Sequence, residues 1–159
     1  MPRHSEVRAL PYTPAQMFDL VADVGSYPQF LPWVSAIRIR SNSETEMLAD
    51  MIVGFKSLKE TFTSRVVKER PGHVHVDYID GPLKHLSNDW RFEDDGQGGC
   101  LVHFSVDFAF KNRLFEMIAG QMFDRALRKM TGAFEARAAE LYAGPSASGS
   151  SNSSAQSAA

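Results

Sequence analysis

Apolar and polar residues alternate through most of the chain between Val34 and Phe110. The clearest case is the segment 100–110, whose alternating apolar residues are Val102, Phe104, Val106, Phe108 and Phe110. A period of two is typical of a strand with one buried and one solvated face. Broken by turn residues, this period predicts strands at 34–42, 46–55, 58–68, 73–79, 86–93 and 100–110.

The residues before this region predict a short strand and a short helix. Residues 4–10 form the strand, and Thr13 followed by Pro14 is a helix start, because threonine caps and proline fits the first helical position. Helical spacing of apolar residues then continues to about Asp23. The aromatic, proline-rich segment 27–33 predicts a helical turn or loop whose rings pack inward.

After the strands, Asn112 can cap a long helix that runs to about Tyr142. Its apolar face is wide enough to cross a large apolar surface and contains Leu114, Phe115, Ile118, Ala119, Met122, Phe123, Ala126, Leu127, Met130 and Phe134. Residues 144–159 are almost entirely Ser, Ala and Gly and predict a disordered tail. The rest of the chain, residues 1–143, is expected to form one domain.

The order of elements indicates an α+β fold, because strands and helices are segregated along the chain. We expect a curved antiparallel sheet wrapped around the long C-terminal helix. Where sheet and helix do not meet fully, an apolar cavity would remain. The hypothesis of a ligand-binding domain depends on that cavity.

Composition excludes several classes of protein. The net charge is −2 with no block of like charge, which argues against a DNA-binding face. The single cysteine, Cys100, cannot form an internal disulfide and fits a reducing compartment. The sequence shows no apolar run of about 20 residues and no room for a leader before the first strand. We therefore expect a cytoplasmic protein, which would associate peripherally with the inner membrane if it carries a lipid.

Four segments resemble the coenzyme Q-binding proteins, a branch of the START-like, polyketide cyclase/dehydrase superfamily. They occur in register over 11–33, 53–66, 80–92 and 110–142, and include "PYTPAQMFDLVADVGSYPQFLPW" and "DGPLKHLSNDWRF". The turn at Gly81 departs from the pattern, because Leu83 stands where phenylalanine is expected and could alter the cavity mouth. A close bacterial branch is known as a ribosome-association toxin, and these motifs do not separate the two branches.

The resemblance implies a helix-grip fold that binds an isoprenoid quinone such as ubiquinone without transforming it. Neither a metal nor a covalent cofactor is implied; ubiquinone would be a bound ligand, carried for respiration and quinone biosynthesis. Partners would be the membrane surface and respiratory or biosynthetic proteins. The alternative is a ribosome-associating protein that binds the large subunit, and a cyclase-type enzyme is the third hypothesis. We expect no catalysis, because the sequence carries no acid–base pair or nucleophile motif.

Strand parity and the helix face predict which side chains line the cavity, although each alone could be ordinary core. The candidate lining residues are Phe30, Trp33, Met51, Val53, Phe62, Val74, Val76, Leu86, Trp90, Phe92, Phe104, Val106, Phe108, Ile118, Met122 and Phe123. Each five-carbon unit could contribute roughly 3–4 kcal/mol on burial, in a pocket of about 300–1,000 Å³. Quinone carbonyls accept hydrogen bonds, and the candidate donors are Ser64, Tyr78, Lys84, Asn88 and Trp90.

Other polar groups favour ordinary structural roles. His73 and His75 share a strand face that parity turns outward, and the sequence reveals no third metal ligand. Cys100 and His103 have opposite parity, so they cannot pair. Asp19 and Asp23 are like charges one helical turn apart. A membrane- or ribosome-facing basic surface is weakly indicated by Lys56, Lys59, Arg65 and Lys68.

Overall fold

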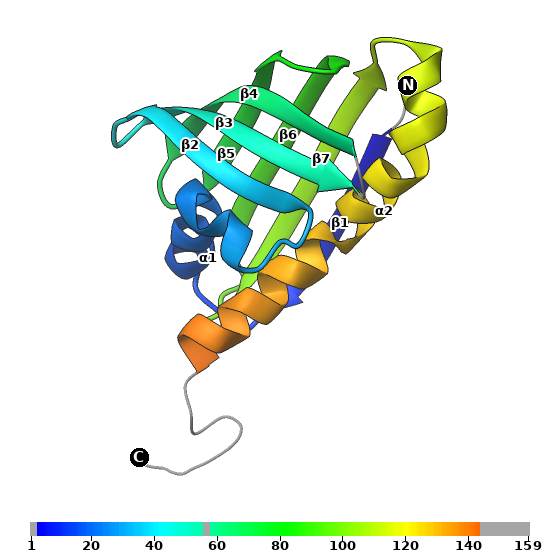
Figure 1. The fold of residues 1–159 in the computed structure, drawn as a ribbon. Coiled ribbons are helices and arrows are strands. Elements are labelled where there is room, and N and C mark those ends of the chain that lie inside the picture. The colour runs from blue at the N-terminus through cyan, green and yellow to red at the C-terminus, as the bar shows by residue number, and fades with distance from the viewer. Residues whose placement is uncertain (1–2, 56–57, 144–159) are drawn as a thin grey trace.

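Seven antiparallel strands form one curved sheet in the order β1-β7-β6-β5-β4-β3-β2 (Figure 1). The computed structural model describes residues 3–55 and 58–143. The strands are β1 (Arg3–Leu10), β2 (Val34–Asn42), β3 (Glu46–Phe55), β4 (Leu58–Glu69), β5 (His73–Asp80), β6 (Leu83–Asp94) and β7 (Cys100–Phe110). All six strands predicted after residue 33 are present, so the alternation was read in the correct period.

Two short helices connect the edge strands β1 and β2: α1 (Pro14–Ala22) and the 3₁₀ helix η1 (Val24–Gln29). The predicted cap at Thr13 is confirmed, because its hydroxyl accepts the Gln16 N–H while the Gln16 side chain accepts the Thr13 N–H. Within η1, Tyr27 is buried and donates to the carbonyl of Val21. The proline-rich segment therefore packs inward as predicted.

The long helix α2 (Arg113–Ala138) lies along the open side of the curved sheet and ends in the π-helical turn η2 (Ala139–Ala143) (Figure 1). Its predicted cap is confirmed, since Asn112 Oδ1 accepts the Phe115 N–H at 2.7 Å. Arg8 fastens β1 to this helix by donating to Thr131 Oγ1 at 3.0 Å and to Glu135 Oε1 at 2.8 Å.

The first turns of α2 carry exposed apolar side chains, and this corrects one prediction. Leu114, Met117 and Ile118 are 67%, 81% and 56% exposed. Leu114 and Ile118 lie on the opposite side of the helix from the buried Phe123, Leu127 and Phe134, so they point away from the sheet. Ile118, predicted to line the cavity, therefore lies on the surface.

The start of β6 also differs from the prediction. β6 begins at Leu83 rather than 86, because Gly81 adopts φ 148° and confines the preceding turn to two residues. Leu83 is 1% exposed, so it fills the core and does not shape a cavity mouth. The predicted tail, 144–159, lies outside the described residues. Among the residues described, no helix is long and apolar enough to cross a membrane.

Candidate functional site

An apolar cavity of about 140 Å³ lies between the sheet and α2 and is partly open to solvent. It is smaller than the predicted 300–1,000 Å³, because large aromatic side chains fill much of the space under the helix. Phe134 alone packs against Tyr27 at 5.2 Å, Phe30 at 5.0 Å and Trp90 at 4.9 Å between ring centroids. The remaining volume resembles that of an engineered apolar cavity that admits a benzene ring.

Many of the predicted lining residues form the wall of this cavity. They are Trp33, Met51, Phe62, Val74, Val76, Leu86, Trp90, Phe104, Val106 and Phe123. Parity placed them correctly because consecutive residues of a strand point to opposite faces of the sheet. Both tryptophans of the chain are in this set. Their role in binding a ligand stays a prediction.

Other predicted lining residues pack elsewhere, and these are corrections. Phe92 is buried under α1, where it meets the Phe18 ring edge-on at 6.3 Å. Phe108 packs against Phe123 at 4.8 Å and does not line the cavity itself. Val53 is core, while Phe30 and Met122 are half-buried outside the lining. The strand residues Val53, Phe92 and Phe108 have inward parity, but parity does not tell where along the sheet the packing is incomplete.

The cavity also contains residues that were not predicted to line it: Val24, Tyr27, Ala49, Val66, Ala126, Leu127, Met130 and Phe134. Ala49 and Val66 continue the parity of Met51 and Phe62, so alternation could have found them. The four residues of α2 belong to the predicted helical stripe. Tyr27 belongs to the segment whose rings were predicted to pack inward, whereas Val24 carried no such signal, because η1 is placed only by the tertiary fold.

Two hydroxyl groups in the wall are available as hydrogen-bond donors. Tyr78 Oη accepts the Leu83 N–H at 2.8 Å, which leaves its own proton free to donate. Burial raises the pKa of Tyr78, so this proton is retained at neutral pH. The Ser64 hydroxyl has no hydrogen-bond partner among the described residues. Ser64 and Tyr78 are therefore the two donors best suited to a carbonyl ligand.

The remaining predicted donors are less suitable. Trp90 Nε1 donates to Asn88 Oδ1 at 3.1 Å, and Asn88 Nδ2 donates to the carbonyl of Ser105 at 2.9 Å. The indole N–H and the amide N–H thus already donate hydrogen bonds within the protein, so they are not available to a ligand. Lys84 is exposed and does not line the cavity.

The cavity wall contains no Asp, Glu, His, Lys or Arg among the described residues. A general acid or base must lie within hydrogen-bond reach of the atom it serves. The titratable side chains in the wall are the tyrosines, and burial raises the pKa of Tyr27 as well. The arrangement can hold an apolar molecule and donate hydrogen bonds to it, but it offers no ordinary proton-transfer group.

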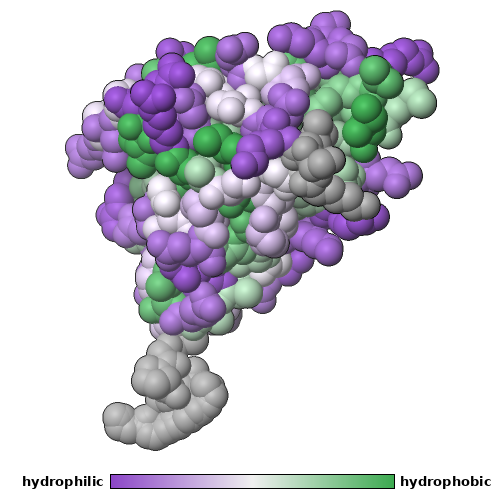
Figure 2. All heavy atoms as spheres, in the orientation of Figure 1, coloured by the Kyte–Doolittle hydropathy of each residue, from purple (hydrophilic) through white to green (hydrophobic). Residues whose placement is uncertain are grey.

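An apolar surface continues from the cavity wall to the start of α2. Phe110 connects the two, since its ring lies 5.6 Å from both Phe115 and Phe123. Figure 2 shows hydrophobic surface over the first turns of this helix, where Leu114, Met117 and Ile118 are exposed. Such contiguous apolar surface is typical of a contact with lipid or another protein.

The structure also shows how the other polar groups considered in the sequence are paired. Asp19 accepts two hydrogen bonds from Arg70, at 2.9 and 3.0 Å, so it is paired rather than repelled by Asp23. The prediction of a basic surface is wrong in part. Lys68 is buried and its Nζ donates to Asn42 Oδ1 at 2.6 Å, and Arg65 Nε lies 3.4 Å from Glu46 Oε2. Lys56 lies outside the described residues.

Cys100 and His103 are not a catalytic pair. Cys100 is fully buried, while His103 turns outward to bond Glu93 at 3.0 Å. His73 and His75 also turn outward, as predicted, but both contact Asp89, a third group that the sequence did not reveal.

Fold and cavity together define a START-like helix-grip protein. A solved START superfamily protein from Mycobacterium smegmatis matches the fold with a TM-score of 0.71, covering 87% of this chain and 98% of the other at 16% identity. The family model for "Polyketide cyclase / dehydrase and lipid transport" matches residues 10–135. The chain belongs to this family.

Relatives within the family carry two different names. The Ribosome association toxin RatA of Escherichia coli K12 is 37% identical over 142 residues, which are 89% of this chain and 90% of the toxin. The mitochondrial Coenzyme Q-binding protein COQ10 homolog B of Xenopus laevis is 33% identical over 143 residues, covering 87% of this chain and 59% of its own length.

Proposed function

We propose that the protein binds an isoprenoid quinone in the cavity under α2 and carries it without chemical change. The observation that carries this proposal is the pairing of an apolar cavity with two available hydroxyls, Ser64 and Tyr78. A quinone has an apolar body and carbonyl oxygens that only accept hydrogen bonds. Similarity to a coenzyme Q-binding protein and to a lipid-transport family supports the same class of ligand.

The cavity volume limits how such a ligand would sit. About 140 Å³ accommodates one ring or a short branched chain, but not a ring with a long isoprenoid tail. Met51 and Met130 line the cavity, and unbranched thioether side chains repack readily to enlarge a pocket. We infer that the head group enters the cavity and the tail lies along the apolar surface formed by Phe110, Phe115 and the first turns of α2.

That same surface supports loading from a bilayer. Leu114, Met117 and Ile118 are exposed at the start of α2, within a few helical turns of the cavity residue Phe123. Insertion of these side chains among acyl chains would remove about 25 cal/mol per Å² of apolar area from water. The protein would thus contact a membrane peripherally while it takes up its cargo.

A carrier role without catalysis is supported by the absence of a charged side chain from the described cavity wall. Cyclisation or dehydration of a bound polyketide would need a group to move protons at the reacting carbon. The Trp90–Asn88 pair is held by hydrogen bonds within the protein, so it too is poorly placed for proton transfer.

The test is a titration of the purified protein with a short-chain ubiquinone. Trp33 and Trp90 both line the cavity, so bound quinone should quench intrinsic fluorescence with saturation at one equivalent. Lipid extracted from protein purified from its native cytoplasm should contain quinone by mass spectrometry. Linear, unsaturable quenching together with quinone-free extracts would overturn the proposal.

Ribosome association is the second candidate, favoured by the 37% identity to RatA over 89% of the chain. Co-sedimentation with the large ribosomal subunit, weakening as salt increases, would support it. The two candidates are separable, because a quinone occupies the cavity whereas a ribosome must contact the outer surface. Sedimentation unaffected by saturating quinone would indicate two independent functions.

A further inference from the structure

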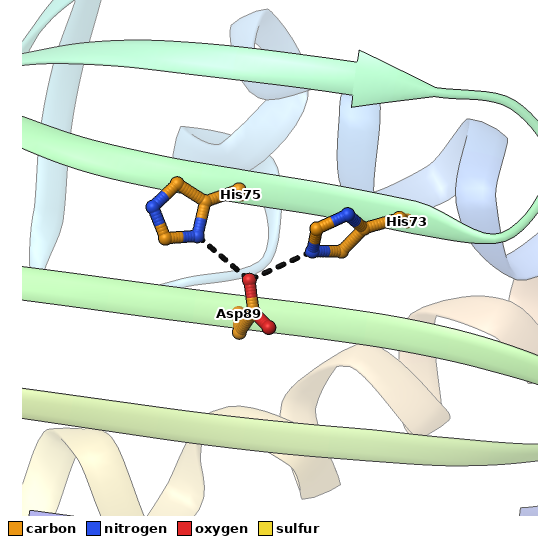
Figure 3. Close-up of side chains that lie close together, drawn as sticks. All are labelled: His73, His75 and Asp89. Atoms are coloured by element: carbon orange, nitrogen blue, oxygen red, sulfur yellow. Dashed lines mark hydrogen bonds and ion pairs between the residues drawn. The ribbon is translucent and has the colours of Figure 1, made fainter.

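Two histidines and one aspartate meet on the outer face of the sheet, away from the cavity. His73 and His75 project from β5, and Asp89 of β6 is the direct register partner of His75. Figure 3 shows both imidazole rings turned toward the Asp89 carboxylate. His73 Nε2 lies 2.8 Å and His75 Nδ1 2.7 Å from the same oxygen, Oδ1.

The other nitrogen of each ring is held by a second carboxylate. Glu69 Oε1 lies 3.0 Å from His73 Nδ1, and Asp77 Oδ1 lies 3.0 Å from His75 Nε2. Histidines that bind metals usually donate their outer N–H to a carboxylate, which sets the tautomer and orients the ring. With protons on these outer nitrogens, both inner nitrogens present lone pairs toward Asp89. A lone pair facing a carboxylate oxygen requires a proton or a cation between them.

We propose that His73, His75 and Asp89 bind a divalent transition-metal ion of the zinc type, with Glu69 and Asp77 as supporting partners of the two imidazoles. Two imidazoles and one carboxylate suit Zn²⁺, Ni²⁺ or Cu²⁺ better than the oxygen-seeking Mg²⁺ or Ca²⁺. Water would supply the fourth ligand of a tetrahedral ion.

The geometry needs only small adjustments to accept the ion. The three ligand atoms lie within 4.8 Å of one another. Tetrahedral coordination with bonds of roughly 2.0–2.2 Å separates ligand atoms by roughly 3.3–3.5 Å. The two nitrogen–oxygen distances, now 2.8 and 2.7 Å, would therefore lengthen by roughly 0.5–0.8 Å, within the reach of side-chain rotation. Arg91 Nε lies 3.4 Å from Asp89 Oδ2, which orients the carboxylate and leaves Oδ1 for the ion.

Exposure and electrostatics also suit a cation. The side chains of His73, His75 and Asp89 are 20%, 29% and 28% exposed, so an ion can enter but is partly shielded from water. The carboxylates of Asp89, Glu69 and Asp77 surround the two rings, and their negative charge favours a cation between them.

The site lies directly behind the cavity but is independent of the proposed quinone binding. Val74 and Val76 of β5, and Asn88 and Trp90 of β6, alternate with the three ligands and line the cavity on the inner face. An ion would join the two strands across their outer face. Failure of quinone binding would leave this proposal intact, because no ligand residue is shared.

The experiment is a calorimetric titration of the chelator-treated protein with ZnCl₂, together with visible absorption on adding Co²⁺. We expect one equivalent of Zn²⁺, unaffected by excess Mg²⁺, and a cobalt spectrum of low coordination number. The variants His75→Gln and Asp89→Asn should each weaken Zn²⁺ binding by about 100-fold or more. The matched control is His103→Gln, an outward histidine on β7 that also pairs with a carboxylate and should bind Zn²⁺ like the wild type.

A second variant guards against misfolding. Asp77→Asn keeps all three ligands and removes only a supporting carboxylate, so it should weaken Zn²⁺ binding by roughly tenfold with an unchanged circular dichroism spectrum. Equal Zn²⁺ affinity in the wild type and His75→Gln would overturn the proposal. An equally large loss in His103→Gln would overturn it as well, because binding would then reflect surface histidines in general.

Discussion

Ser64 on β4 lies directly opposite Tyr78 on β5, and both side chains line the apolar cavity. Cross-strand partners on one face approach closely, so their hydroxyls can address the same ligand atom. The Leu83 N–H donates to Tyr78 Oη and fixes the direction of its remaining proton. In a mostly apolar wall, this pair determines where a carbonyl-bearing head group would be held.

Removal of either hydroxyl should weaken quinone binding. We expect Ser64→Ala and Tyr78→Phe each to cost about 1 kcal/mol, or roughly fivefold in Kd, since each deletes one hydrogen bond. Quenching of tryptophan fluorescence by a short-chain ubiquinone measures the change. Ser87→Ala is the control, because Ser87 is exposed on the outer face of β6. Wild-type affinity in both cavity variants would show that the head group binds elsewhere.

Filling the cavity should abolish binding without unfolding the protein. Ala126 lines the cavity from α2, and leucine there would occupy much of about 140 Å³. We expect Ala126→Leu to change the free energy of unfolding by no more than about 1–3 kcal/mol while Kd rises at least tenfold. Denaturant unfolding and fluorescence quenching measure the two quantities. Ala136→Leu, on the exposed face of the same helix, should leave quinone binding unchanged.

The turn at Gly81 should tolerate no side chain. A Cβ there would lie 2.8 Å from both Thr61 O and Tyr78 Oη, at a φ of 148° that favours glycine. We expect Gly81→Ala to destabilise the fold by about 1–3 kcal/mol and to weaken quinone binding by displacing the tyrosine. Gly96→Ala separates the two effects, because Gly96 has φ 81° but no atom within 4 Å of its Cβ. It should lose stability and keep its quinone affinity.

Acid should destabilise the β2–β4 region through Asp50. This buried carboxylate accepts hydrogen bonds from Thr63 at 2.7 Å and Arg40 at 2.9 Å, and these lower its pKa. A carboxylate whose pKa is lower in the folded state than in the unfolded state stabilises the fold. This stabilisation is complete above about pH 4, the ordinary pKa of aspartate, and is lost as the pH falls through the folded-state pKa. Asp50→Asn should cost about 1–3 kcal/mol at pH 7. The unfolding free energy of this variant should also fall less steeply in acid than that of the wild type. Parallel pH profiles of the two proteins would contradict this.

Cys100 should be inert in the native state. The thiol is fully buried, and burial raises its pKa to about 11. Only the thiolate reacts with disulfide reagents. We therefore expect 5,5′-dithiobis(2-nitrobenzoic acid) at pH 8 to label the native protein at the rate of unfolding, and the denatured protein at once. Rapid labelling of native protein would show that β7 opens locally.

Local patterns in the sequence were sufficient to predict the elements and their faces. The alternation around Phe104 predicted β7 and its inward side chains, and Thr13 and Asn112 predicted where the helices begin. These features depend on backbone geometry and on neighbours within a few residues. The sequence alone therefore determined the α+β class and most of the cavity face.

Only the tertiary structure decided which inward residues enclose a space and which polar groups meet. Ile118 belongs to the predicted apolar stripe, yet it lies on the side of α2 that points away from the sheet. Asp89 reaches His75 because β5 and β6 pair in one register, and a shift by one residue would turn its side chain to the other face. Which side of the helix meets the sheet, and in which register the strands pair, arise from packing across the whole chain, which no local pattern encodes.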